Sequence, residues 1–111
     1  MIRMLTDDDM GVARIPECVI VEWAEEGKRV VFSYAQQGKA ISVHFATDRA
    51  GLRHLRAAIG DFCKWLFWAY SWCRIIFAVI GRRSVLKIAE DCEFKYLTNK
   101  NDYQIYMRVR E

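Results

Sequence analysis

The stretch WLFWAYSWCRIIFAVI, residues 65–80, is the most apolar part of the chain and decides how the fold is divided. It is shorter than the roughly 17–25 apolar residues that a transmembrane helix needs, and Arg74 stands inside it. The run therefore predicts buried core rather than a membrane span. Its second part, RIIFAVI, is rich in β-branched residues and apolar on both faces, as in a central strand covered on both sides. We expect a helix to end near Trp72 and a buried strand to occupy residues 74–80.

A long amphipathic helix is predicted before this strand. Apolar side chains recur at intervals of three, four or seven residues within residues 46–73, which is the spacing of one helix face. A helix of roughly 20 residues would be on the order of 30 Å long, and Thr47 or Asp48 is a suitable N-cap. After the buried strand, Gly81 predicts a break, and residues 82–94 predict a second, shorter helix.

Three runs before the long helix alternate apolar and polar residues with period two, as half-buried strands do. They are centred on residues 19–23, 30–34 and 41–45. The segments EEGK and QQGK between them each contain a glycine that can adopt positive φ in a tight turn. This pattern predicts a three-stranded antiparallel meander.

The C-terminal part predicts a hairpin. Residues 94–98 and 103–109 flank the polar turn NKND, and alternation favours the face that carries Tyr103, Ile105, Met107 and Val109 as the buried one.

The N-terminal sequence predicts a short edge strand at residues 2–5. Thr6 or Asp7 in the following TDDDM could cap a helical turn. Taken together, the elements predict a single mixed α/β (α+β) domain over residues 1–111.

Composition narrows the class of protein. The chain has 111 residues, of which 53% are hydrophobic, and one proline, which favours one folded core over a disordered chain. A net charge of +3 without a nucleic-acid motif makes nucleic acid an unlikely partner. The four cysteines lack CxxC or metal-ligand spacing, and the N-terminus lacks an apolar signal segment. We therefore expect reduced thiols, no metal, no membrane association and a cytoplasmic location.

The order of these elements resembles that of the GNAT N-acyltransferase (acetyltransferase) fold. TDDDM after an opening strand is similar to the start of that family's first helix, and RIIFAVIGRRSVLKIAEDCEFKYL is similar to its strand, helix and following strand. More narrowly, the chain resembles small GNAT-like proteins of short-tailed bacteriophages, in which ECV also opens the meander and a Ser/Thr-Asp pair precedes the long helix. The resemblance implies a GNAT-like mixed sheet and acetyl-CoA or CoA as the ligand. It also implies N-acetyl transfer in the host cytoplasm.

The resemblance also implies where acyl-CoA would bind. In the family, a loop of the type Arg/Gln-x-x-Gly-x-Gly/Ala holds the pyrophosphate at the start of the long helix, where N–H groups are unpaired. DRAGLRHL is the equivalent stretch here, without the later glycine. The pantetheine would lie between two splayed strands. The residues implied are Arg49, Ala50, Gly51, Leu52 and Arg53 in the loop, Val43 and Phe45 in the slot, and Arg82 at the position of the family's asparagine.

Catalytic groups are assigned through the same resemblance. The family's usual acid, a tyrosine on the helix after the central strand, falls on Ala89 here. Tyr103 or Tyr106 could replace it. Glu22 lies where carboxylate bases of the family often lie, and His44 could also act as the base, although the sequence favours both as ordinary exposed strand residues. Two hypotheses therefore stay open: an N-acyltransferase, or an inactive GNAT-like phage protein that binds a host or virion protein.

Aromatic side chains surround the end of the long helix on every side. One helix in so small a domain cannot bury all of these rings, and an exposed apolar patch often marks an interface. Tryptophan is also favoured in binding hot spots. We expect Trp65, Trp68 and Trp72 to mediate homodimerisation or docking on another protein, unless the N-terminal segment covers them.

Overall fold

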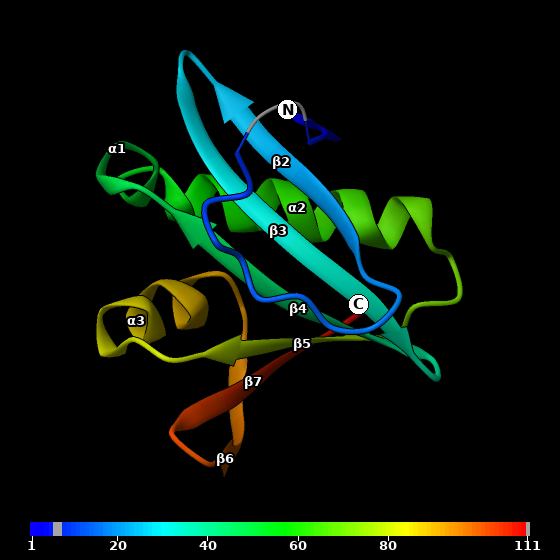
Figure 1. Cartoon of the computed structure of the whole chain (residues 1–111). Coiled ribbons are helices and arrows are strands. Elements are labelled where there is room, and N and C mark those ends of the chain that lie inside the picture. The colour runs from blue at the N-terminus through cyan, green and yellow to red at the C-terminus, as the bar shows by residue number, and fades with distance from the viewer. Residues whose placement is uncertain (6–7, 111) are drawn as a thin grey trace.

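The computed structural model describes residues 1–5 and 8–110. Within them, seven strands form one mixed sheet in the spatial order β1-β2-β3-β4-β5-β7-β6, accompanied by three helices (Figure 1). The strands are β1 (Ile2–Met4), β2 (Val19–Glu25), β3 (Lys28–Gln37), β4 (Ala40–Thr47), β5 (Ile75–Ile80), β6 (Lys95–Lys100) and β7 (Tyr103–Val109). The helices are α1 (Arg49–Leu52), α2 (Leu55–Ala69) and α3 (Arg83–Asp91).

The predicted meander and edge strand are confirmed. β2, β3 and β4 pair antiparallel in sequence order, and β1 pairs with β2. The apolar face of this meander packs on α2, where the rings of Phe32 and Phe62 stack with centroids 4.0 Å apart. The suggested cap at Thr6 or Asp7 lies outside the described residues.

The two faces of the sheet are covered differently. α2 and α3 cover one face, and Leu55, Leu66 and Val85 are among the side chains buried there. The N-terminal segment crosses the other face over the meander (Figure 1), where Val12 is buried and the Ser33 hydroxyl donates to the Ala13 carbonyl. We call this second side the open face, because no helix among the described residues covers it.

The apolar run 65–80 divides as expected into the end of a helix and a strand, but its details differ. α2 ends at Ala69, a little before Trp72, because the Arg110 guanidinium binds the carbonyls of Phe67, Tyr70 and Cys73. These bonds satisfy acceptors that a helix end leaves unpaired. No helix in the described part of the chain is long and apolar enough to cross a membrane.

The prediction of one continuous long helix is wrong at residues 53–54. α1 is a separate turn that lies against β3, and the His54 N–H bonds to the Gly51 carbonyl before α2 begins. Gly51 is buried, and a Cβ there would overlap Thr47 Oγ1 and the Arg29 carbonyl oxygen. This close contact with β3 holds the first turn out of line with α2.

The predicted buried faces of β5 and β7 also need correction. Tyr106 on β7 faces α3 and is buried, whereas Tyr103 and Val109 are exposed. On β5, Ile76 and Ile80 are buried but Phe77, on the open face, is only half-buried. Alternation alone cannot tell which of two apolar faces the helices will cover.

We expect Gly51→Ala to lower the free energy of unfolding by about 1–3 kcal/mol, because the added methyl group must displace β3 or Thr47. Gly60→Ala in α2 is the matched control. A Cβ at Gly60 meets nothing within 4 Å, so this change should stabilise the helix by about 0.5–1 kcal/mol. Urea denaturation without ligand measures both. Equal effects of the two variants would contradict this account of α1.

Candidate functional site

The sheet opens between its two central parallel strands. β4 and β5 pair from Ala40–Ile75 to Val43–Ala78. β4 continues to Thr47 and β5 to Ile80, but no pair between them is found beyond that point in the described chain. The backbone groups along these facing edges are therefore left without a neighbouring strand.

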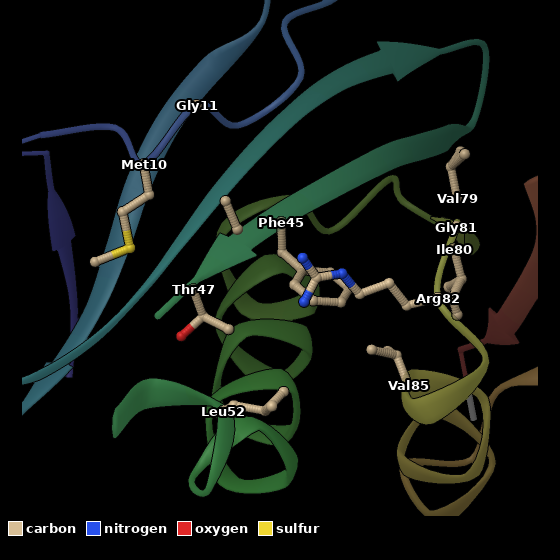
Figure 2. Close-up of a pocket in the computed structure, with 11 residues that line it drawn as sticks. Met10, Gly11, Phe45, Thr47, Leu52, Val79, Ile80, Gly81, Arg82 and Val85 are labelled. Carbon is tan, nitrogen blue, oxygen red and sulfur yellow. The ribbon is translucent and has the colours of Figure 1, made fainter. Parts of the chain in front are cut away.

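A cavity of about 300 Å³ lies at this opening (Figure 2). Phe45, Leu52 and Val85 line it from β4, α1 and α3, and Met10 reaches it from the N-terminal segment. We call it the splay cavity. It combines apolar walls with exposed strand edges, which suits an elongated ligand that carries amide groups.

Arg82 is the only charged side chain among the described residues that line the splay cavity. It is the N-cap residue of α3, and its side chain reaches from the end of β5 toward Phe45 on β4 (Figure 2). No hydrogen bond or ion pair of its guanidinium is found in the described part of the chain. Arg82 is therefore available to bind an anion at this opening.

The start of α1 is less open to a ligand than expected. Asp48 caps it, with its carboxylate accepting a bond of 2.8 Å from the Gly51 N–H and its carbonyl accepting one from Leu52. Of the residues expected to form the phosphate loop, Leu52 lines the splay cavity, whereas Arg49 and Arg53 are exposed. The chain's own carboxylate thus stands where the resemblance placed a phosphate.

A larger cavity of about 550 Å³ lies on the open face. It is lined from β4 by Ser42 and His44 and from β7 by Tyr103 and Ile105. We call it the open-face cavity. Val79 on β5 lines both cavities, so they are adjacent at the end of this strand.

Two of the four candidate catalytic residues therefore border one cavity. His44 is half-buried, and its burial lowers the pKa of the imidazole below the ordinary value of 6.5. It is mainly neutral at pH 7 and can accept a proton. Tyr103 is half-exposed, and its ring lies close to Gly81 at the end of β5.

The other two lie elsewhere. Glu22 is fully buried, with its carboxylate bonded to Arg3 Nε at 2.9 Å and Arg29 Nε at 2.6 Å. Tyr106 lies on the helix side, 3.5 Å from Glu90 Oε1, and burial raises the pKa of its hydroxyl. Neither borders the splay cavity or the open-face cavity. Ala89, to which the resemblance assigned the position of the acid, is buried between α3 and the sheet.

Several lining residues were not singled out from the sequence. Met10 and Gly11 follow Asp9, whose carboxylate accepts from the Gly11 N–H in a turn. Lys100 and Asn101 belong to the stretch NKND, for which the sequence predicts only a polar turn between two strands. Local pattern carries no signal for them, because they reach the cavities only through the packing of distant segments.

The aromatic end of α2 is divided between core and surface. Trp65 packs on Tyr34, Phe62 and Tyr70. Trp68 is 81% exposed, and Trp72 is 37% exposed. The N-terminal segment leaves Trp68 uncovered, and its role in association stays a prediction.

Trp65→Ser should lower the free energy of unfolding by about 1–3 kcal/mol, because its ring belongs to an intramolecular cluster. Trp68→Ser should change it by less than about 0.5 kcal/mol, since the ring is exposed. Thermal denaturation of the two single variants tests this division. Sedimentation of Trp68→Ser then reports association separately from folding, and a large loss of stability in this variant would contradict its placement.

The pKa of His44, followed by NMR titration, should lie below 6.5. On acidification, the unfolded chain binds a proton at His44 at a higher pH than the folded chain does. The free energy of unfolding therefore falls as the pH drops from about 6.5 to the folded-state pKa, and it levels off below that pKa. His44→Gln should lack this part of the pH dependence, as measured by urea denaturation at several pH values. A pKa at or above 6.5 would refute the assignment.

The comparison with solved structures confirms the GNAT-like fold. The chain is similar to ribosomal-protein-S5-alanine acetyltransferase from Vibrio fischeri, with a TM-score of 0.65 and 15% sequence identity. The match covers 85% of this chain and 62% of that protein, so the chain spans less than two thirds of its length. No protein-family model and no curated protein matches the sequence. The narrower resemblance to phage proteins stays a prediction.

Proposed function

We propose that the protein binds acyl-CoA in the splay cavity and transfers the acyl group to an amine. The observation that carries the proposal is the early end of the β4–β5 pairing, which leaves strand edges facing a cavity of about 300 Å³. The GNAT-like fold supports it, because the neighbour that shares this fold is named as an acetyltransferase. Fold alone does not establish activity, so the proposal depends on the residues at the opening.

The residues of the splay cavity fit most of such a ligand. The unpaired edges of β4 and β5 would bond to the amides of its pantetheine arm, and Phe45, Leu52 and Val85 would contact its apolar parts. The Arg82 guanidinium would bind a phosphate, for which its planar set of donors is well suited. α1 contributes less than the family pattern implies, because the Asp48 carboxylate already accepts from Gly51.

When bound, acyl-CoA supplies a thioester whose acyl carbon accepts an amine nucleophile. His44 is our candidate for the base, since its neutral imidazole can take a proton from the amine. Tyr103 is our candidate for the acid, since its hydroxyl can donate a proton to the departing sulfur. Both border the open-face cavity, which is adjacent to the splay cavity at Val79.

A second candidate function keeps the fold and omits the catalysis. Trp68, 81% exposed, favours a protein that docks on a host or virion partner through the end of α2. Ala89, at the position that the resemblance assigns to the acid, also favours a protein without catalysis. Firm CoA binding without turnover would favour this docking function over acyl transfer.

Arg82→Glu should weaken CoA binding at least tenfold, because it replaces the free cation of the splay cavity with a negative charge beside a phosphate. Arg83→Glu is the matched control, since Arg83 is exposed and does not line the cavity. Calorimetry on the whole chain measures both affinities. Equal affinity of the Arg82→Glu variant and the unmodified protein would overturn the site.

A further inference from the structure

We propose that the chain has a second binding site, for a small molecule with a quaternary ammonium group, in a cavity at the end of α2. We call it the aromatic cavity, because Tyr34, Tyr70 and Trp72 line it. Its volume of about 230 Å³ is below the roughly 300–1,000 Å³ of sites for drug-sized ligands, so it suits a smaller molecule. The inference does not depend on acyl-CoA binding.

The aromatic cavity is separate from the splay cavity. Ile41, near the start of β4, lines the first, whereas Phe45 and Thr47 at the other end of β4 line the second. No described residue lines both. Val19 on β2 pairs with Tyr34 on β3, so their side chains lie on the same face of the sheet. Tyr34 contacts Phe62 of α2, which identifies this as the helix side.

The three rings form walls that face different directions. The ring centroids of Tyr34 and Tyr70 are 5.8 Å apart with an interplanar angle of 66°. Those of Tyr70 and Trp72 are 5.6 Å apart at 59°. The hydroxyls of Tyr34 and Tyr70 share a hydrogen bond of 2.8 Å, which orders these two rings before a ligand binds. A cation within about 6 Å of such ring centroids is attracted by the negative faces of the rings.

The charge of the aromatic cavity also favours a cation. Glu17 is the only charged side chain among the described residues that line it, and it is exposed at residue level. The described part of the chain provides no hydrogen bond or ion pair to its carboxylate. Arg110 bonds to the Tyr70 carbonyl but does not line the cavity. A cationic ligand therefore meets an opposite charge here, and an anionic ligand meets a like one.

The lining favours a quaternary ammonium over a primary one. The two tyrosine hydroxyls bond to each other, and the other side-chain oxygens of the described lining belong to Glu17 and Gln36. A primary ammonium brings three N–H donors, each of which needs an acceptor when it leaves water. A quaternary ammonium brings none, and its methyl groups can contact the rings, Val19 and Ile41.

Three probes of similar shape or function test the ligand class. Choline carries the quaternary ammonium, 3,3-dimethylbutan-1-ol has a neutral carbon in place of its nitrogen, and ethanolamine has a primary ammonium. NMR titration of the whole chain, followed at the backbone amide of Val19, gives the three affinities. We expect choline to bind more tightly than each of the other two by about tenfold or more.

Two pairs of variants test the residues. Trp72→Leu should weaken choline binding by about tenfold. Trp68→Leu is its matched control and should not change the affinity, because Trp68 is exposed and does not line the cavity. Glu17→Gln should weaken binding by about threefold, since an exposed charge is partly screened. Glu26→Gln is its control, because Glu26 is also exposed with positive φ and lies outside the lining.

Four results would overturn the inference. They are no response of the Val19 amide to choline, equal binding of choline and its neutral analogue, equal binding of choline and ethanolamine, or an affinity for choline that Trp72→Leu leaves unchanged. Circular dichroism of each variant confirms that it is folded. The outcome is separable from that of the proposed function, because Arg82→Glu should leave choline binding unchanged and Trp72→Leu should leave CoA binding unchanged.

Discussion

The early end of the pairing between β4 and β5 is the constraint on which the rest of this structure depends. Parallel strands normally continue their ladder, yet here the last pair is Val43 with Ala78 while both strands run on. α1 and α3 begin just beyond the two separated ends, and the contact of Gly51 with β3 fixes α1 on its side. The splay cavity exists because these packing contacts hold the strand ends apart.

The sheet can keep such an opening because its other parts are firmly packed. On the helix side, Phe32 and Phe62 stack at the centre of a continuous core. At the β1 edge of the sheet, the buried Glu22 carboxylate on β2 forms ion pairs with Arg3 on β1 and Arg29 on β3. These pairs link the three strands. A buried charge is costly unless it is paired in this way. Losing either arginine would therefore leave a buried charge with less compensation, so these pairs hold the three strands in this arrangement.

The candidate site differs from what the GNAT resemblance implied at the start of α1 and at position 89. The Asp48 carboxylate caps the start of α1, to which the resemblance assigned a phosphate, and Arg82 lines the splay cavity from the start of α3. Ala89 is enclosed by core contacts, so a tyrosine would not fit there without displacing neighbours. His44 and Tyr103, the base and acid of our proposal, line the cavity on the open face instead.

The sequence by itself determined the elements, because period-two alternation in the meander and the apolar spacing of α2 are local signals of burial. The resemblance to the GNAT fold also implied two splayed strands, with Val43 and Phe45 in the slot between them. Tertiary structure alone decided that α1 separates from α2, that Tyr106 rather than Tyr103 faces the helices, and that Lys100 reaches the cavity of His44. The physical reason is that these features depend on contacts between residues far apart in the chain, such as Gly51 with Arg29, which no local pattern encodes.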